Sequence, residues 1–286
     1  MPDGYAHREV LVDTVWLGDH LQDPTVRVAE VSEDVTLYDR GHIPGAVQFN
    51  WQTQLQDRVR RDWITKEQFE HLLGACGVDN ATTLVLYGDK HNWFATYSLW
   101  LCRMYGVQRV HILNGGRAKW VAEGRPMAAD VPSYPRVALR AKNPDLRIRA
   151  FRDQVLARLG DPGVALVDVR SPQEYRGEVI TVPAYPHEGA QRGGHIPGAQ
   201  NIPWSHNVRD DGTFKAREDL RRLYESRGVH QTTRSSPTAG SASVRPSPGS
   251  RSRTCSDTHA SATTTGPGRS GAALSARRSS GPHSAH

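Results

Sequence analysis

Apolar residues along the chain fall into short continuous runs and into longer segments where they recur at helical spacing. The runs predict buried strands, and the longer segments predict amphipathic helices. In the first half we predict strands at 10–12, 26–31, 82–87 and 110–113, helices at 13–20, 65–76 and 93–105, and a turn into a further helix at 114–120. Strands that alternate with helices indicate βα units and a mostly parallel sheet.

The same order restarts after a proline-rich, aperiodic segment, Pro126–Pro144, which we interpret as a linker. A helix with Phe151, Val155 and Leu159 on one face precedes a strand at 164–170. A later helix at 214–228 repeats the helix at 66–77 of the first half. The pattern predicts two domains of the same fold, as the length of 286 residues allows.

One short sequence occurs twice and supports a duplication. The segment 41–51, Gly-His-Ile-Pro-Gly-Ala-Val-Gln-Phe-Asn-Trp, returns at 194–204 as Gly-His-Ile-Pro-Gly-Ala-Gln-Asn-Ile-Pro-Trp, 153 residues later. That spacing is the size of a domain and exceeds the repeat of a solenoid. Ile-Pro followed by Gly-Ala is typical of a turn, so we interpret His42 and His195 as turn-packing residues and not as catalysts.

The pattern stops near Val229. The last 56 residues contain fourteen serines, seven arginines and one acidic residue, with no Phe, Trp or Tyr. Such a segment buries too little apolar surface to offset its chain entropy, so we predict a truncated second domain and a disordered tail at 231–286. The whole net charge of +6 lies in this tail. A nucleic-acid-binding function is therefore the weakest alternative, because the tail has no aromatic residues to stack on bases.

The three cysteines lie far apart and form no CxxC pair. This spacing argues against a disulfide framework and a zinc site and is typical of a cytoplasmic protein. Cys76 and Cys102 lie among apolar residues of predicted helices, which is typical of core thiols. We find no secretory signal, no apolar run long enough to span a membrane, no metal-ligand spacing and no phosphate loop, and we predict no cofactor.

Three motifs carry a resemblance to a known family: Asp-Val-Arg-Ser-Pro-Gln-Glu-Tyr at 168–175, the doubled His-Ile-Pro-Gly-Ala, and Leu-Asn-Gly-Gly-Arg-Ala-Lys-Trp at 113–120. Together and in this order they resemble the tandem-domain rhodaneses, the thiosulfate sulfurtransferases. The resemblance covers about residues 8–230. It implies two α/β domains, each a mostly parallel sheet flanked by helices, at 8–125 and 147–230 with a linker at 126–146.

In this family the first domain is usually silent, and the second carries a nucleophilic cysteine in a Cys-Arg-x-Gly-x-Arg-Ser loop. The loop is missing from this chain. In the first copy Asp89 stands at the nucleophile position, and a carboxylate cannot carry a persulfide. In the second copy the cysteine is expected near Gly240, where none is present. We interpret Cys255, some 15 residues too late, as a chance cysteine of the tail.

The resemblance also implies a thiosulfate donor, a thiophilic acceptor and a monomer. Arg170 and Arg192 are the candidate anion-binding residues, with a structural Asp-Arg pair as the alternative for Arg170. The chain as written is predicted to be inactive for lack of the nucleophile. A non-catalytic binding or regulatory module is the alternative function.

The tail composition is typical of a GC-rich gene read in a wrong frame. With suitable codons, 237–246 read in a shifted frame gives Tyr-Cys-Arg-Ile-Gly-Glu-Arg-Ser-Ser, which is the family's active-site loop. In the same frame, 263–271 gives Tyr-Asp-Gly-Ser-Trp-Pro-Glu-Trp, a counterpart of 113–120. We therefore hypothesise a one-base slip between Val229 and Pro237.

Overall fold

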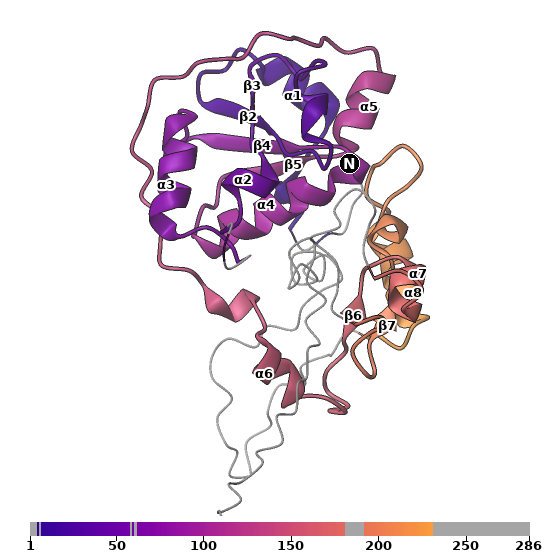
Figure 1. Cartoon of the computed structure of the whole chain (residues 1–286). Helices are drawn as coiled ribbons and strands as arrows, with labels where there is room; N and C mark the ends of the chain where they lie inside the picture. Colours follow the sequence, from indigo (N-terminus) through magenta and orange to yellow (C-terminus); the bar gives the residue numbers. More distant parts are fainter. Residues whose placement is uncertain (1–4, 6, 58, 60–61, 181–191, 231–286) are drawn as a thin grey trace, which may run out of the picture.

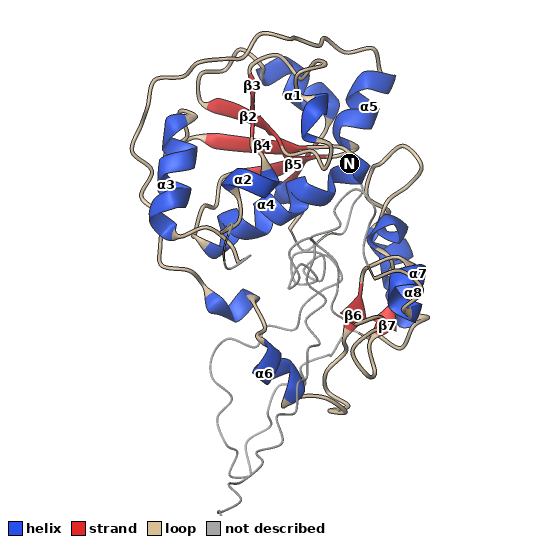
Figure 2. Ribbon diagram, viewed as in Figure 1, coloured by secondary structure: helices blue, strands red, loops and turns tan. Residues whose placement is uncertain are grey.

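The computed structural model describes residues 5, 7–57, 59, 62–180 and 192–230. The first half forms a five-stranded sheet in which all strands are parallel and the order is β1-β5-β4-β2-β3 (Figures 1 and 2). The strands are β1 (Leu11–Val12), β2 (Val26–Glu30), β3 (Ala46–Gln48), β4 (Thr83–Tyr87) and β5 (Val110–Leu113).

Helices cover both faces of this sheet (Figure 2). They are α1 (Thr14–His20), α2 (Trp51–Gln54), α3 (Lys66–Ala75), α4 (Trp93–Met104) and α5 (Gly116–Ala122). Leu17 of α1 and Trp120 of α5 pack in one buried cluster, whereas Phe69 of α3 and Phe94 of α4 pack in another. Sequence and structure agree on α1, α3, α4 and α5, and a capping box between Thr65 and Gln68 fixes the start of α3.

The second half repeats the same arrangement in a shorter form. It contains α6 (Arg152–Leu156), β6 (Val167–Asp168), α7 (Pro172–Arg176), β7 (Gln200–Asn201) and α8 (Arg217–Glu225). β6 and β7 pair in parallel with Val167 opposite Gln200, as Ala29 lies opposite Val47 in β2 and β3. The two copies of the chain therefore share one pairing register.

Two predicted elements of the second half are shorter than expected. The strand predicted at 164–170 is reduced to Val167–Asp168, because β6 pairs with β7 alone among the described residues. The helix predicted on Phe151, Val155 and Leu159 ends at Leu156, and Phe151 caps it with 40% of its surface exposed. The sequence pattern missed the short elements α2, α7, β3 and β7. The predicted disorder of 231–286 lies outside the described residues.

A segment of the second half packs against the first. The Trp204 ring stacks on Trp93 with centroids 5.6 Å apart, and Lys119 forms an ion pair with Asp211 at 3.3 Å. The buried Phe214 amide donates to Asn114 Oδ1 at 2.9 Å, and the Phe214 ring joins the core of the first half. Pattern reasoning gave no sign of this docking, because the segment has neither helical nor strand periodicity. No helix in the described part of the chain is long and apolar enough to cross a membrane.

Candidate active site

The loop after β4 lies at the carboxyl edge of the first sheet, where ligands of open parallel sheets bind. It begins at Gly88, which is closely packed: a Cβ atom there would lie 2.2 Å from the Val31 carbonyl oxygen. No side chain, and so no cysteine, fits at position 88 without moving this backbone. The first half therefore has no room for a nucleophile at the start of its loop.

Asp89 is the residue predicted at the nucleophile position. Its carboxylate faces the backbone of the loop after β2. Its Oδ1 accepts from the Glu33 amide at 2.5 Å and its Oδ2 from the Asp34 amide at 3.1 Å. The Asp89 amide donates to Ser32 Oγ at 3.3 Å. These bonds give Asp89 a structural role between the loops after β2 and β4.

The rest of this loop adopts a conformation that L-residues avoid. Lys90, His91 and Asn92 have φ values of 45°, 56° and 68° in succession, each at a cost of roughly 1–2 kcal/mol. The buried Asn92 side chain holds them: its Oδ1 accepts from Gly88 N at 3.0 Å, and its Nδ2 donates to Leu113 O at 2.8 Å. The loop is thus a closed turn, not an open cradle around a reacting atom.

We predict that Gly88→Ala destabilises the fold by roughly 2–3 kcal/mol, because the added methyl group overlaps the Val31 carbonyl. Urea unfolding followed by circular dichroism measures the change. Gly163→Ala is the matched control: its added methyl group would meet only the Asp161 side chain, at 3.2 Å, and we expect a change within about 0.5 kcal/mol. Equal stability of the two variants would contradict the packing argument.

A buried charge cluster lies beneath the loop. Glu30, at the end of β2, is fully buried, and its Oε2 accepts from Arg117 Nη1 at 2.8 Å and from the Tyr87 hydroxyl at 2.6 Å. Its Oε1 accepts from the Ser32 hydroxyl at 2.8 Å. Burial and the Glu30 charge hold the pKa of Tyr87 well above its ordinary value, so the phenol stays a donor. The cluster ties β2 and β4 to α5, and pattern reasoning missed it because its members are far apart in sequence.

Asp168 is the second-half counterpart of Glu30, and its partner is Arg170. Arg170 Nη2 lies 2.6 Å from Asp168 Oδ2 and donates to Gly194 O at 2.8 Å. The hydrogen bonds to Asp168 raise the pKa of Arg170. This geometry is that of the structural Asp-Arg pair, the alternative left open by the sequence, and contact of Arg170 with thiosulfate stays a prediction. Arg192 is exposed just before the second His-Ile-Pro-Gly-Ala turn, and its role also stays a prediction.

The two repeated histidines pack in their turns. His42 is fully buried, stacks on Tyr38 with centroids 3.9 Å apart, and directs its ring nitrogens to the Tyr38 and Asp130 carbonyl oxygens, each at 3.0 Å. His195 stacks on Tyr175 with centroids 3.7 Å apart. Both copies therefore use the histidine and a tyrosine to shape the turn.

The two described cysteines are poor nucleophiles. Burial raises the pKa of the Cys76 thiol, and it raises that of the fully enclosed Cys102 to about 12. A thiol with a raised pKa holds little thiolate at neutral pH. Cys255 and Gly240 lie outside the described residues.

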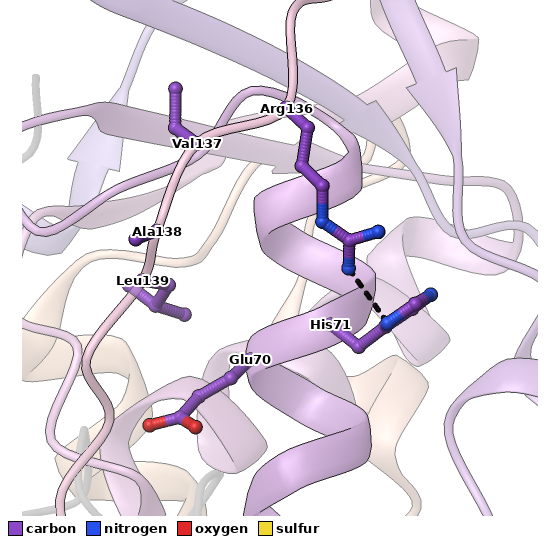
Figure 3. A pocket seen from close by; sticks show the side chains of 6 residues that line it. All are labelled: Glu70, His71, Arg136, Val137, Ala138 and Leu139. Carbon is purple, nitrogen blue, oxygen red and sulfur yellow. Dashed lines mark hydrogen bonds between the residues drawn. The ribbon is translucent and has the colours of Figure 1, made fainter.

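A shallow cavity of about 490 Å³ lies between α3 and the linker (Figure 3). Its polar lining includes Glu70, His71 and Arg136, and Arg136 Nη2 donates to His71 Nδ1 at 2.7 Å (Figure 3). It contains no cysteine and none of the predicted site residues. Across the described ranges no group of three His, Cys, Asp or Glu residues is placed to hold a metal ion.

Comparison with known proteins identifies similar sequences and folds. The profile of the rhodanese-like domain family matches residues 13–123 and 151–233. The sulfur carrier protein TtuD of Thermus thermophilus is 55% identical over 79% of this chain and 80% of its own length. A putative thiosulfate sulfurtransferase of Haloferax volcanii is 48% identical over 78% of this chain and 79% of its own.

A solved structure supports the likeness in three dimensions. The crystal structure of SseA from Escherichia coli, described with the rhodanese fold of 3-mercaptopyruvate sulfotransferases, aligns with a TM-score of 0.68. The alignment has 26% sequence identity and covers 78% of this chain and 85% of that one. Both halves of the described structure therefore have known counterparts.

Proposed function

The chain belongs to the rhodanese-like domain family, and from that premise we propose that it derives from a thiosulfate sulfurtransferase. A cysteine thiolate attacks the outer sulfur of thiosulfate, the sulfur–sulfur bond breaks, and sulfite leaves with the bonding electron pair. The persulfide then passes its outer sulfur to cyanide or a thiol, which regenerates the thiolate. The chain as written has no nucleophile for this reaction, so we expect it to be inactive.

The observation that carries the proposal is the match of the family profile to both halves of the chain. A hypothetical second reading frame of the tail, written with codons chosen to fit, adds to it. Each residue of that frame is built from the third base of one codon and the first two bases of the next. A serine codon of the TCN type therefore always yields Phe, Leu, Ile or Val in the shifted frame. Where TCN codons encode the serines, the shifted frame thus reads as large apolar residues, as a buried sheet and helix require, whereas AGC and AGT codons give Glu, Gln, Lys or a stop.

The shifted frame extends the match beyond the active-site loop. If TCN codons encode Ser235 and Ser236, the shifted frame reads them as two large apolar residues directly before a small residue, Tyr and Cys. The shifted Tyr, read at codon 238, follows Tyr87 of β4 by 151 residues, the same spacing that separates Gly228 from Gly77. The shifted Gly read at codon 266 follows Gly115 by the same 151 residues. The spacing of 151 residues between these corresponding positions is the same before and after the proposed slip. This favours a single inserted or lost base.

The restored loop has the residues that sulfur transfer needs. Two arginines follow the cysteine in Cys-Arg-Ile-Gly-Glu-Arg-Ser and would lower the thiol pKa by their charge. The same charges attract the thiosulfate dianion. One relative is named a sulfur carrier protein, and we propose that this chain likewise carries sulfur and passes it to cyanide or a thiol.

The literal chain has a second candidate function as a non-catalytic binding or regulatory module. The closed loop at Gly88–Asn92 favours this for the first half, because its carboxylate and amide side chains are used within the fold. A chain with the printed sequence can have only the binding function, because it lacks the nucleophile loop. A chain with the restored frame can have both functions.

Sequencing the coding DNA across codons 228–240 tests the frame directly. We expect one additional base after codon 229, followed by a series of the type TAC TGC CGG that encodes Tyr-Cys-Arg. The slip would be refuted by DNA that encodes the printed sequence and lacks this series in the frame that starts at the third base of each codon. The chain would then be a pseudoenzyme, and incubation with thiosulfate would give no persulfide by mass spectrometry.

A further inference from the structure

The loop after β4 is held at its two ends by the first half. Gly88 O accepts from the Arg117 amide at 3.0 Å, and Asn92 lies against Gly116, where a Cβ atom would be 2.5 Å from Asn92 Oδ1. Gly116 has a φ of 57°, so this close approach belongs to the start of α5. The first half therefore fixes where the loop begins and ends. The His91 ring, between these ends, contacts the second half instead.

The second half covers the middle of the loop with residues 204–214, which we call the docking segment. This segment lies beside α5 (Figure 1). The ring centroids of His91 and Trp204 are 5.7 Å apart, and Trp204 also stacks on Trp93, the residue that follows the loop. Gly212, with a φ of 77°, packs on the same ring, because a Cβ atom there would be 3.4 Å from His91 Nδ1. The docking segment is therefore in direct contact with the loop.

The docked loop has two unfavourable features. Residues 90–92 all have φ values in the left-handed region, which L-residues avoid. In addition, His91 Nδ1 is buried and has no hydrogen-bond partner among the described residues, which is unfavourable for a polar atom. Trp204 and Gly212 lie over this imidazole, so undocking would open it to water. The burial of the nitrogen therefore depends on the second half.

Other contacts of the docking segment offset these costs. Phe214 is buried in the core of the first half, and its amide donates to Asn114 Oδ1 at 2.9 Å. Asp211 forms an ion pair with Lys119 of α5 at 3.3 Å. These contacts lie on α5 and on the turn before it, and not on the loop. Favourable contacts at one surface can therefore hold the neighbouring loop in an unfavourable conformation.

We propose that the loop 88–92 is a two-state element whose strained state is selected by the docking segment. When the segment undocks, the loop relaxes out of the left-handed region and exposes the His91 imidazole and the Trp93 ring. The coupling is reciprocal, because a partner that binds the relaxed loop weakens the docking of the second half by the same factor. This device goes beyond the proposed function, and it does not depend on the reading frame of the tail.

Hydrogen exchange of the full 286-residue chain tests the coupling. Trp204→Ala removes the ring that stacks on Trp93 and covers His91, so we expect the amides of 88–92 to exchange at least tenfold faster while the amides of β4 keep their rates. Trp204→Phe keeps an aromatic ring at this position and should recover most of the protection. Phe151→Ala removes an aromatic ring of the second half at the start of α6, and it is the matched control with no change expected in the loop.

The exchange rates have two results that would overturn the proposal. If 88–92 exchanges at the same rate in Trp204→Ala as in the unmodified chain, the first half alone fixes the loop. If β4 and the loop accelerate by the same factor, the loop is not a separate element.

Modification of His91 by diethyl pyrocarbonate, measured by mass spectrometry, is an independent readout of its burial. We expect His91 to react at least tenfold faster in Trp204→Ala than in the unmodified chain, with the exposed His71 as the internal standard. Equal reaction of His91 in the two proteins would contradict the conclusion that docking buries this ring.

A variant of the loop itself tests the strain. Lys90 has a φ of 45°, a region that asparagine adopts more readily than lysine. Lys90→Asn should therefore slow the exchange of the loop amides at least threefold. Lys90→Ala is the matched control, because it loses the same contact with Glu33 at 3.9 Å and keeps the strain, so it should not slow the exchange. Equal exchange rates in these two variants would refute strain as the property that the docking segment maintains.

Discussion

Insertion of one base after codon 229 of a DNA that encodes the printed chain and has the hypothesised codons should convert an inactive chain into a thiosulfate sulfurtransferase. The expected gain in thiocyanate formation from thiosulfate and cyanide is at least about a thousandfold, because loss of a covalent nucleophile typically costs a factor of about 10⁴ or more. The assay is a colorimetric thiocyanate measurement on the two purified proteins at equal concentration.

Two controls make this result specific. In the frame-restored protein, a serine in place of the new cysteine should return the rate to that of the printed chain, with an unchanged melting temperature. Cys76→Ser in the same protein should keep the rate, because the Cys76 thiol is held by burial at a raised pKa. Restored folding without any thiocyanate would contradict the thiosulfate proposal, and activity that survives the serine change would contradict the nucleophile.

The fold could be predicted where the local signals were strong. The strand expected at 82–87 and the helix expected at 65–76 depend on neighbours in sequence, and both elements form close to the expected bounds. The strand expected at 164–170 is short because strand length depends on a partner, and the described chain supplies β7 alone. Sequence periodicity cannot reveal such a missing partner.

The candidate site was harder to predict from sequence because its geometry is set by contacts across large separations. The lack of a nucleophile in the first copy followed from the sequence of the loop after Tyr87, Gly88-Asp89, which contains no cysteine. The sequence did not predict that the Asp89 carboxylate accepts hydrogen bonds from the Glu33 and Asp34 amides, because those residues lie more than fifty positions away. The Arg170 side chain shows the opposite case: its pairing with Asp168, two residues earlier, was an alternative that the sequence had already offered.

Removal of the Arg117 guanidinium should be among the most damaging single changes to the first half. Glu30 is fully buried, so Arg117→Ala leaves a carboxylate in the core with only the Tyr87 and Ser32 hydroxyls as donors. Breaking one partner of a buried ion pair costs about 3–5 kcal/mol. Urea unfolding at pH 7 measures this loss.

A surface pair and a double variant give this prediction its control. Arg40→Ala removes the partner of Asp34 from a pair in which both side chains are largely exposed, and it should cost at most about 1 kcal/mol. Glu30→Gln combined with Arg117→Met removes both buried charges and should recover at least half of the loss, because the uncompensated charge is the main cost. If Arg117→Ala is no more destabilising than Arg40→Ala, Glu30 has found water or another donor, and the cluster beneath the loop does not hold β2, β4 and α5 together.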